Sequence, residues 1–237
     1  MPGAGPIVIL GVFVADTAYR AVRQPRMGET LLGSGFKLGP GGKGSNQAVA
    51  AGRLGAEVSF LTRLGVAPFA VMARQTWQEA GVTAEASDTP ESYTGAAYIF
   101  VEEGTGNNAI IVAPGAAGLI SAADIEAKAG LIRSASVFVT QLEQPLEAAI
   151  RALEIAKAAG VTTILNPAPA AVLPDAIYPL CDYVTPNETE TEALTGLPVT
   201  TVEEARAAAA AFIAKGAGAA RITLGEKGAL LHGKGVS

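Results

Sequence analysis

The run IVILGVFV, residues 7–14, is apolar at every position apart from one glycine. A strand with one face in water alternates apolar and polar residues, whereas a strand covered by helices on both faces does not. We therefore predict that Ile7–Val14 forms a buried strand of a parallel sheet. No basic residue precedes the run, which argues against a signal peptide.

Outward from this run, apolar stretches and helical patterns alternate along the chain. Further buried strands are predicted at Val58–Thr62, Val137–Thr140, Thr162–Leu165, Tyr183–Thr185 and Arg221–Leu224. Helices are predicted at Gly44–Leu54, Ala70–Ala80, Ala122–Ile132, Leu146–Ala159, Glu188–Leu194 and Val202–Lys215. Strands that alternate with helices through short connections predict an α/β fold with a doubly wound, mostly parallel sheet flanked by helices.

Two segments interrupt this alternation and predict β-hairpins. Residues 17–38 have no helical pattern and predict a strand near Thr30–Leu38, and residues 94–113 place strand-like runs on both sides of Gly104–Asn107. We expect the hairpins to pair into a small, separate β-sheet that closes over a ligand as a lid. The predicted domains are an α/β core of residues 1–16, 39–93 and 114–237 and a lid of residues 17–38 and 94–113.

Composition excludes several classes of protein. Of the 237 residues, 49% are hydrophobic and 16% are charged, so the chain can bury a core and is not disordered. A net charge of −5 argues against a general nucleic-acid binder. No apolar run approaches the roughly 18 residues of a membrane span, so a cytoplasmic location is expected. A single cysteine, Cys181, rules out an intramolecular disulfide, and a single histidine, His232, disfavours a Ser-His-Asp triad.

The most informative motif is the glycine-rich segment Gly39-Pro-Gly-Gly-Lys-Gly-Ser-Asn46, which runs into a predicted helix. Glycines allow the backbone to approach a ligand, and the first turn of a helix offers unpaired N–H groups. The spacing also matches a dinucleotide fingerprint of a nicotinamide-dependent dehydrogenase, but the segment follows a hairpin where that motif requires a strand. A plain turn before a helix would need fewer glycines. We favour a ligand site.

Polar residues follow several of the predicted strands. These are Asp16, Glu143, the pair Asn187 and Glu190, and Thr223 with Gly225. Each has a structural alternative: a strand end, a carboxylate at a helix start, a capping box, and a tight turn. Because the carboxyl ends of parallel strands meet at one edge of a sheet, a single crevice would collect all of them.

Five segments together resemble one family, the phosphofructokinase-B type carbohydrate kinases, and within it the ribokinase branch. They are GGKGSNQAVAAGRLG (Gly41–Gly55), TQLEQP (Thr140–Pro145), NPAPA (Asn166–Ala170), TPNETE (Thr185–Glu190) and ITLGEKG (Ile222–Gly228). The segments occur in the family's order, and the similarity covers essentially the whole chain. The resemblance implies ATP- and Mg²⁺-dependent phosphorylation of the primary hydroxyl of ribose or a related sugar. It also implies a homodimer that forms through the lid, and a monovalent cation, K⁺, whose site is not in this chain.

The resemblance assigns roles to individual residues. It implies sugar binding by Asp16, Gly42, Lys43, Asn46 and Glu143. It implies nucleotide binding by Asn187, Thr223 and Gly225, and Mg²⁺ binding by Glu190 and Asn187. Carboxylate, amide and ammonium groups bind sugar hydroxyls, and phosphoryl transfer needs mainly positioning and charge neutralisation.

Two departures from the family pattern bear on activity. Val14 stands where the family usually has asparagine, which removes one sugar hydrogen bond and weakens the expectation of ribose itself. The family's catalytic base is an aspartate in an Asp-Thr-x-Gly-Ala-Gly-Asp segment, which we expect beyond Ser237. The alternative function is therefore a catalytically inactive sugar-binding protein derived from such a kinase.

Overall fold

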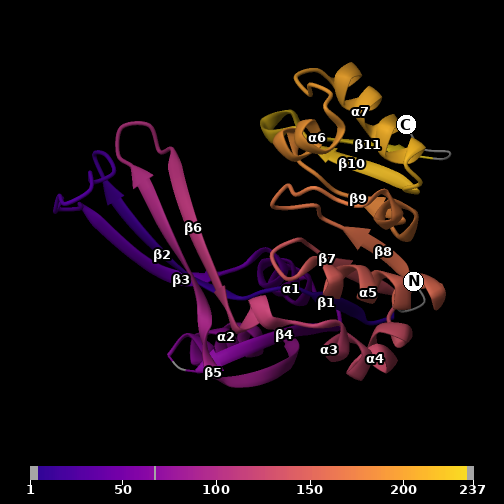
Figure 1. The fold of residues 1–237 in the computed structure, drawn as a ribbon, viewed down its shortest axis with the longest axis horizontal. Helices are drawn as coiled ribbons and strands as arrows, with labels where there is room; N and C mark the ends of the chain where they lie inside the picture. The colour runs from indigo at the N-terminus through magenta and orange to yellow at the C-terminus, as the bar shows by residue number, and fades with distance from the viewer. Residues whose placement is uncertain (1–4, 67, 234–237) are drawn as a thin grey trace.

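The computed structural model describes residues 5–66 and 68–233, and it contains an α/β core with an arm of long strands (Figure 1). The strands are β1 (Ile7–Leu10), β2 (Val14–Ala21), β3 (Gly35–Gly41), β4 (Val58–Val66), β5 (Val82–Glu102), β6 (Asn108–Gly115), β7 (Val137–Thr140), β8 (Thr162–Leu165), β9 (Tyr183–Val184), β10 (Ala219–Thr223) and β11 (Ala229–Gly233). The α-helices are α1 (Lys43–Arg53), α2 (Phe69–Glu79), α3 (Ala122–Ala127), α4 (Ala129–Ser134), α5 (Leu146–Ala158), α6 (Glu188–Thr195) and α7 (Val202–Ala214). Short 3₁₀ helices are η1 (Ala116–Leu119), η2 (Asp175–Leu180) and η3 (Gly225–Lys227).

The predicted fold class is confirmed. The sheet runs in the order β11-β10-β9-β8-β7-β1-β4-β5-β2-β3, and β6 pairs with β5. Strand β1 lies at its centre, where Ile7 is in register with Val58 of β4 and with Val137 of β7, both in parallel. Among the core strands of residues 5–66 and 68–233, only the outer pair β10–β11 is antiparallel. All parallel strands therefore end at one edge of the sheet.

The prediction of one continuous strand at Ile7–Val14 is wrong. Strand β1 ends at Leu10, and the chain enters the second strand, β2, at Val14. A side chain on Gly11 would lie within 2.8 Å of the Cα of Gly44, so the chain can leave the core sheet here only because this residue has no side chain. The sequence run is apolar throughout because both strands are buried, although they belong to different parts of the sheet.

The lid consists of β2, β3, β6 and the second half of β5, and its strands project from the core (Figure 1). Its two hairpins pair as expected, since β2 lies parallel to β5 with Ala15 in register with Ala96. The lid is not a separate sheet, however, because β5 is 21 residues long and its first half pairs with β4 in the core. Strands β2 and β5 cross the predicted domain boundaries, which stay a prediction.

Two hydrophobic clusters cover opposite faces of the central strands. Ile9 lies in one cluster, with Phe60 of β4 and Trp77 of α2. Val8 and Leu10 lie in the other, which includes residues of α3, α4, α5 and α7. Successive side chains of a strand point to opposite faces, so this division shows that β1 is covered on both sides. Strands β7 and β8 instead alternate between buried and half-buried positions.

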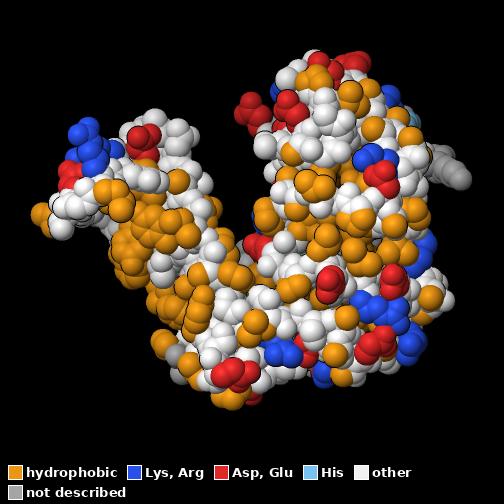
Figure 2. Space-filling view, viewed as in Figure 1, with side chains coloured by type: hydrophobic (Ala, Val, Ile, Leu, Met, Phe, Trp, Pro, Cys, Tyr) orange, Lys and Arg blue, Asp and Glu red, His pale blue; other side chains and the backbone are white. Residues whose placement is uncertain are grey.

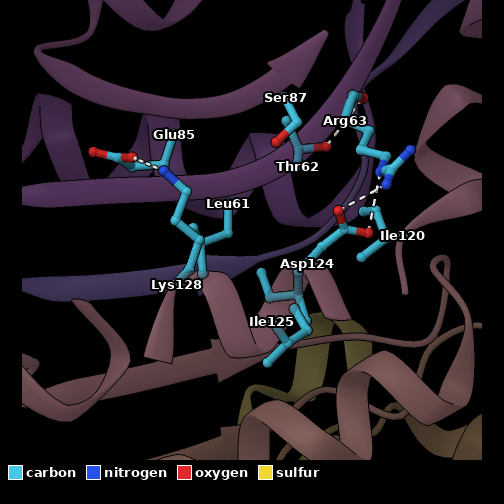
Figure 3. A pocket seen from close by; sticks show the side chains of 10 residues that line it. Leu61, Thr62, Arg63, Glu85, Ser87, Ile120, Asp124, Ile125 and Lys128 are labelled. Atoms are coloured by element: carbon cyan, nitrogen blue, oxygen red, sulfur yellow. Dashed lines mark hydrogen bonds and ion pairs between the residues drawn. The ribbon is translucent and has the colours of Figure 1, made fainter. Parts of the chain in front are cut away.

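A small cavity lies between β4, β5 and α3, and two ion pairs cross it (Figure 3). Arg63 makes a two-pronged contact with Asp124, with N–O distances of 2.7 and 3.1 Å, and the Lys128 ammonium lies 2.7 Å from Glu85. The cavity volume is about 20 Å³, which is room for one water molecule. These charges therefore join α3 to the sheet and do not form a ligand site.

The helix predicted over Ala122–Ile132 is divided at Lys128, where φ is −109° and ψ is 9°. Ser121 and Asp124 form a capping box at the start of α3, which is a local signal for that helix alone. Within the described part of the chain, no helix is long and apolar enough to cross a membrane.

Candidate functional site

The polar residues singled out in the sequence follow strands that end at one edge of the sheet, with one exception. Asp16 was expected directly after the first strand, but it lies inside the lid strand β2, because the chain enters that strand at Val14. Gln141–Glu143 follow β7, Asn166 follows β8, Thr185–Asn187 follow β9, and Thr223 ends β10. The helix α1 begins at the same edge, because its first turn packs against the connection between β1 and β2. Figure 2 shows a hollow between the core and the lid. A single crevice that collects every predicted residue stays a prediction, since the pocket at this edge is lined by Asn187, Glu190 and Thr223 but not by Asp16, Glu143 or Gly225.

Gly41, Gly42 and Gly44 of the Gly39–Asn46 segment allow close packing of the chain upon itself. Gly42 has φ of +90°, and a side chain there would collide with the carbonyl oxygen of Val12. A side chain on Gly41 would collide with the carboxylate of Asp16. Gly41 and Gly42 thus bring α1 against β2, and the approach of a ligand to this segment stays a prediction. Their effect on the site is indirect: they place Asp16 beside the start of α1.

The expected sugar-binding residues meet at this junction. The backbone N–H of Lys43 donates to Oε2 of Glu143 at 2.7 Å, a contact between residues 100 positions apart. Burial raises the pKa of Glu143, the N–H and charge of Lys43 oppose the rise, and the nearby charge of Asp16 adds to it. Burial also raises the pKa of Asp16. Two carboxylates and one ammonium group thus share a partly desolvated corner.

Asn46 is exposed on the first turn of α1, and its backbone N–H donates to the carbonyl oxygen of Gly42 at 2.9 Å. Its neighbour Ser45 is buried, and the Ser45 hydroxyl accepts a hydrogen bond from the indole N–H of Trp77 at 2.9 Å. The buried side of this turn is therefore fixed by α2, while its exposed side carries the asparagine amide.

The residues expected to bind nucleotide and metal lie on the other side of the crevice. Asn187 and Glu190 form a reciprocal capping box: the backbone N–H of Asn187 donates to Glu190 Oε2 at 2.9 Å, and the N–H of Glu190 donates to Asn187 Oδ1 at 2.7 Å. The structural alternative for this pair is thus present. The second carboxylate oxygen of Glu190 is not used by the cap. Thr223 is tied to the same segment, because its N–H donates to the carbonyl oxygen of Pro186 at 3.0 Å.

Gly225 begins the 3₁₀ turn η3 with φ of +53° and is exposed. A Cβ at this position would lie 3.8 Å from Oε1 of Glu188, so the turn faces the start of α6. No cluster of three or more His, Cys, Asp or Glu side chains that could hold a metal ion occurs in residues 5–66 and 68–233. A divalent ion at Glu190 would therefore need water or phosphate oxygens as its other ligands, as is usual for Mg²⁺.

An open pocket of about 320 Å³ joins the two halves of the site. It is lined by Lys43, Gln47, Asn166, Ala168, Thr185, Asn187, Glu190, Arg221 and Thr223. Four of these residues were not predicted as site residues: Gln47, Asn166, Thr185 and Arg221. The signal for Asn166 was its place directly after a buried strand. Gln47 and Arg221 gave no such signal, because they lie inside a helix and a strand.

The nicotinamide-dependent dehydrogenase loses support from the geometry. The strand directly before the glycine motif is the lid strand β3. A dinucleotide fingerprint instead follows a strand of a βαβ unit. Cys181 is buried, and burial raises the pKa of its thiol to about 12, so the thiol stays protonated.

Comparison with known proteins decides the family. Residues 7–237 match the model of the pfkB family of carbohydrate kinases. The chain belongs to this family. The carbohydrate kinase is 39% identical over 226 residues to a deoxyribokinase of Salmonella typhi, covering 94% of this chain and 74% of the relative. It is 38% identical over 232 residues to a ribokinase of Haemophilus influenzae, covering 98% of this chain and 76% of the relative.

A solved structure agrees with this assignment. The ribokinase of Arabidopsis thaliana, complexed with ribose and ATP, superposes with a TM-score of 0.88 at 29% identity. The match covers 99% of this carbohydrate kinase and 77% of the Arabidopsis chain. The predicted resemblance is therefore confirmed at the level of the family and its ribokinase-like members.

Replacing Glu143 by glutamine is expected to raise thermal stability, and to raise it more at pH 8 than at pH 5. Because burial raises the pKa of Glu143 above its ordinary value of 4.5, the folded protein keeps a proton that the unfolded chain has lost just above that pH. Stability therefore falls as pH rises through this range. Glutamine carries no such charge and still accepts the N–H of Lys43.

The measurement is the melting temperature of both proteins at pH 5 and pH 8, with Glu147→Gln, an exposed glutamate on α5, as the matched control. An equal difference in melting temperature at the two pH values would contradict the expectation.

Proposed function

We propose that this carbohydrate kinase transfers the terminal phosphoryl group of ATP to the primary hydroxyl of ribose or a closely related pentose. The observation that carries the proposal is the shared pocket: Lys43 lines it from α1, and Asn187 and Thr223 line it from the ends of β9 and β10. A sugar held beside Lys43 would thus lie next to phosphates held beside Asn187. Placing two reactants side by side is a large part of catalysis in phosphoryl transfer.

The sugar half of the proposed site consists of Asp16, Gly42, Lys43, Asn46 and Glu143. The carboxylates of Asp16 and Glu143 would accept hydrogen bonds from sugar hydroxyls, and the Lys43 ammonium would donate to one. Gly42 lies against the carbonyl oxygen of Val12, and Gly41 lies against the carboxylate of Asp16, so the start of α1 lies beside Asp16. Polar groups in a partly buried site favour ligands that carry matching hydroxyls.

The nucleotide half consists of Asn187, Thr223 and Gly225, with Glu190 and Asn187 proposed to hold Mg²⁺ through bound water. Glu190 fits this role because its cap uses only one carboxylate oxygen. When bound, Mg²⁺ would neutralise charge on the transferred phosphate. The Lys43 ammonium would do the same from the sugar side. A requirement for K⁺ remains a proposal from the family.

The identity of the pentose is open between ribose and 2-deoxyribose, since relatives of both names match this chain almost equally well. Val14 is buried at the start of β2, two residues before Asp16. An apolar residue at this position cannot hydrogen-bond a hydroxyl. We therefore propose that the site discriminates weakly between sugars that differ by one hydroxyl, within about 10-fold.

The experiment measures ADP release with ribose and with 2-deoxyribose, alongside binding of each sugar by calorimetry. The proposed function requires both saturable binding and sugar-dependent ADP release. Binding without ADP release would instead establish the inactive sugar-binding protein, and the absence of binding would refute both. The single tryptophan, Trp77, offers a second signal for binding, because it contacts the turn that carries Asn46.

We also propose that a second copy of this chain covers one face of the lid. Tyr19, Phe36, Leu38 and Ile111 are exposed lid residues, and Figure 2 shows hydrophobic side chains gathered over this arm. Tyr19 and Phe36 are direct cross-strand neighbours, with ring centroids 5.1 Å apart. An exposed apolar face of this kind is typical of an interface. Sedimentation equilibrium tests the proposal, and a monomer in solution would refute it.

The cytoplasmic location stays a prediction.

A further inference from the structure

Three side-chain amides form a continuous chain of hydrogen bonds across the carboxyl edge of the sheet. Nε2 of Gln141, after β7, donates to Oε1 of Gln47 on α1 at 2.5 Å. Nε2 of Gln47 donates to Oδ1 of Asn166, after β8, at 3.4 Å. Nδ2 of Asn166 donates to the carbonyl oxygen of Thr185, after β9, at 2.9 Å. We call Gln141, Gln47 and Asn166 the amide relay.

The amide relay connects the two halves of the proposed site. Gln47 lies one helical turn after Lys43 on α1, so both side chains are on the same face of the helix, and both line the pocket. At the other end, Thr185 begins the segment that carries Asn187, whose neighbour Pro186 accepts the N–H of Thr223. One end of the relay therefore touches the helix that holds the sugar, and the other touches the segment that holds the phosphates.

The relay has one direction, because each amide donates to the next one. Such chains strengthen each bond through mutual polarisation, and a break at one member affects the others. Gln141 is fully buried, and its side-chain Oε1 has no hydrogen-bond partner. The hydrogen bond that its Nε2 donates to Gln47 is therefore the bond that offsets the cost of burying this amide. A shift of α1 on sugar binding would therefore be passed to Asn166 and Thr185, since breaking the relay leaves buried polar groups unpaired.

We propose that Gln47 and Asn166 are positioning residues that couple sugar binding to nucleotide binding. The inference rests on the proposed function, because it assumes that sugar binds beside Lys43 and phosphate beside Asn187. Neither residue needs to touch the reacting atoms. Their role is to fix the spacing of the two halves of the site. Their removal should therefore make sugar binding and nucleotide binding independent of each other without abolishing either.

The test measures ribose affinity by calorimetry in the presence and absence of the non-hydrolysable analogue β,γ-imido-ATP with Mg²⁺. In the unmodified protein the analogue is expected to change the ribose dissociation constant by about 5-fold or more. In Asn166→Ala and in Gln47→Ala the change should fall to within about 2-fold, while ribose affinity without nucleotide stays within about 3-fold. The double variant should lose no more coupling than either single one, as expected for residues that act as a unit.

A more conservative variant distinguishes a loss of coupling from misfolding. Gln47→Glu keeps the acceptor for Gln141 but replaces the donor to Asn166 by a second acceptor oxygen with a negative charge, so it should also lose the coupling. Gln75→Ala is the matched control, because this exposed glutamine of α2 bonds only to Glu79 within its own helix. Unchanged coupling in the relay variants, or no coupling in the unmodified protein, would overturn the inference. Failure of the unmodified protein to bind ribose and nucleotide at all would refute the proposed function as well.

Discussion

Replacing Lys43 by methionine is expected to weaken ribose binding by about 10- to 100-fold. A hydrogen bond to a charged group contributes about 1.5–3 kcal/mol, and each 1.4 kcal/mol is a factor of ten in affinity. Methionine keeps most of the apolar length of the side chain and leaves the backbone N–H of Lys43 free to donate to Glu143. The loss would also remove the positive charge that opposes the raised pKa of Glu143. Calorimetry of ribose binding measures the effect.

The control for this variant is Lys215→Met. Lys215 follows α7, and its ammonium lies 3.1 Å from the exposed carboxylate of Asp175, outside the pocket. It should bind ribose with unchanged affinity. If Lys43→Met binds ribose within 2-fold of the unmodified protein, the sugar half of the site lies elsewhere.

Replacing Trp77 by alanine is expected to lower the free energy of unfolding by about 3–5 kcal/mol. Trp77 is fully buried, and its ring lies 5.0 Å from that of Phe60 and 5.7 Å from that of Phe13, measured between centroids. Alanine would leave a cavity in this cluster and would also remove the hydrogen bond to the buried hydroxyl of Ser45. For a chain of this size, the melting temperature should fall by roughly 6–20 °C.

Circular dichroism follows the unfolding, since the variant has no tryptophan left to report it by fluorescence. Val71→Ala serves as the control, because Val71 is 62% exposed on the same helix and its loss should cost no more than about 0.5 kcal/mol. A loss below 1 kcal/mol in Trp77→Ala would mean that the cluster closes over the gap. Because Trp77 supports the turn that carries Asn46, ribose affinity in the folded fraction should fall as well.

Most elements of the core could be predicted from the sequence because their signals are local. Strands β7 and β8 occur at the predicted residues, and helices α5 and α7 begin where they were predicted and end one residue early. In each of these cases an apolar run or a helical period is bounded by a turn or a cap, so the sequence contains the whole signal. The hairpin around Gly104–Asn107 is of the same kind: the glycines mark the turn, and strand-like runs mark both strands.

The incorrect or missing predictions concern features that depend on contacts between residues far apart in the sequence. The end of β1 at Leu10 depends on the closeness of Gly11 to Gly44, which are 33 residues apart in the sequence, and the apolar pattern does not change there. The long strand β5 reads as two segments in the sequence but joins the core to the lid as one strand. The amide relay could not be predicted, since nothing in the sequence shows that Gln47 faces Asn166.

The sequence by itself determined the fold class, the family and the set of residues at the strand ends, because apolar periodicity and short motifs are properties of neighbouring residues. The tertiary structure determined which contacts those residues make with one another. It placed the backbone of Lys43 against Glu143, gave the glycines their role in packing, and used Asn187 and Glu190 to cap α6. Burial raises the pKa of Glu143, and long-range hydrogen bonds join the two halves of the pocket. Both exist only after the chain has folded.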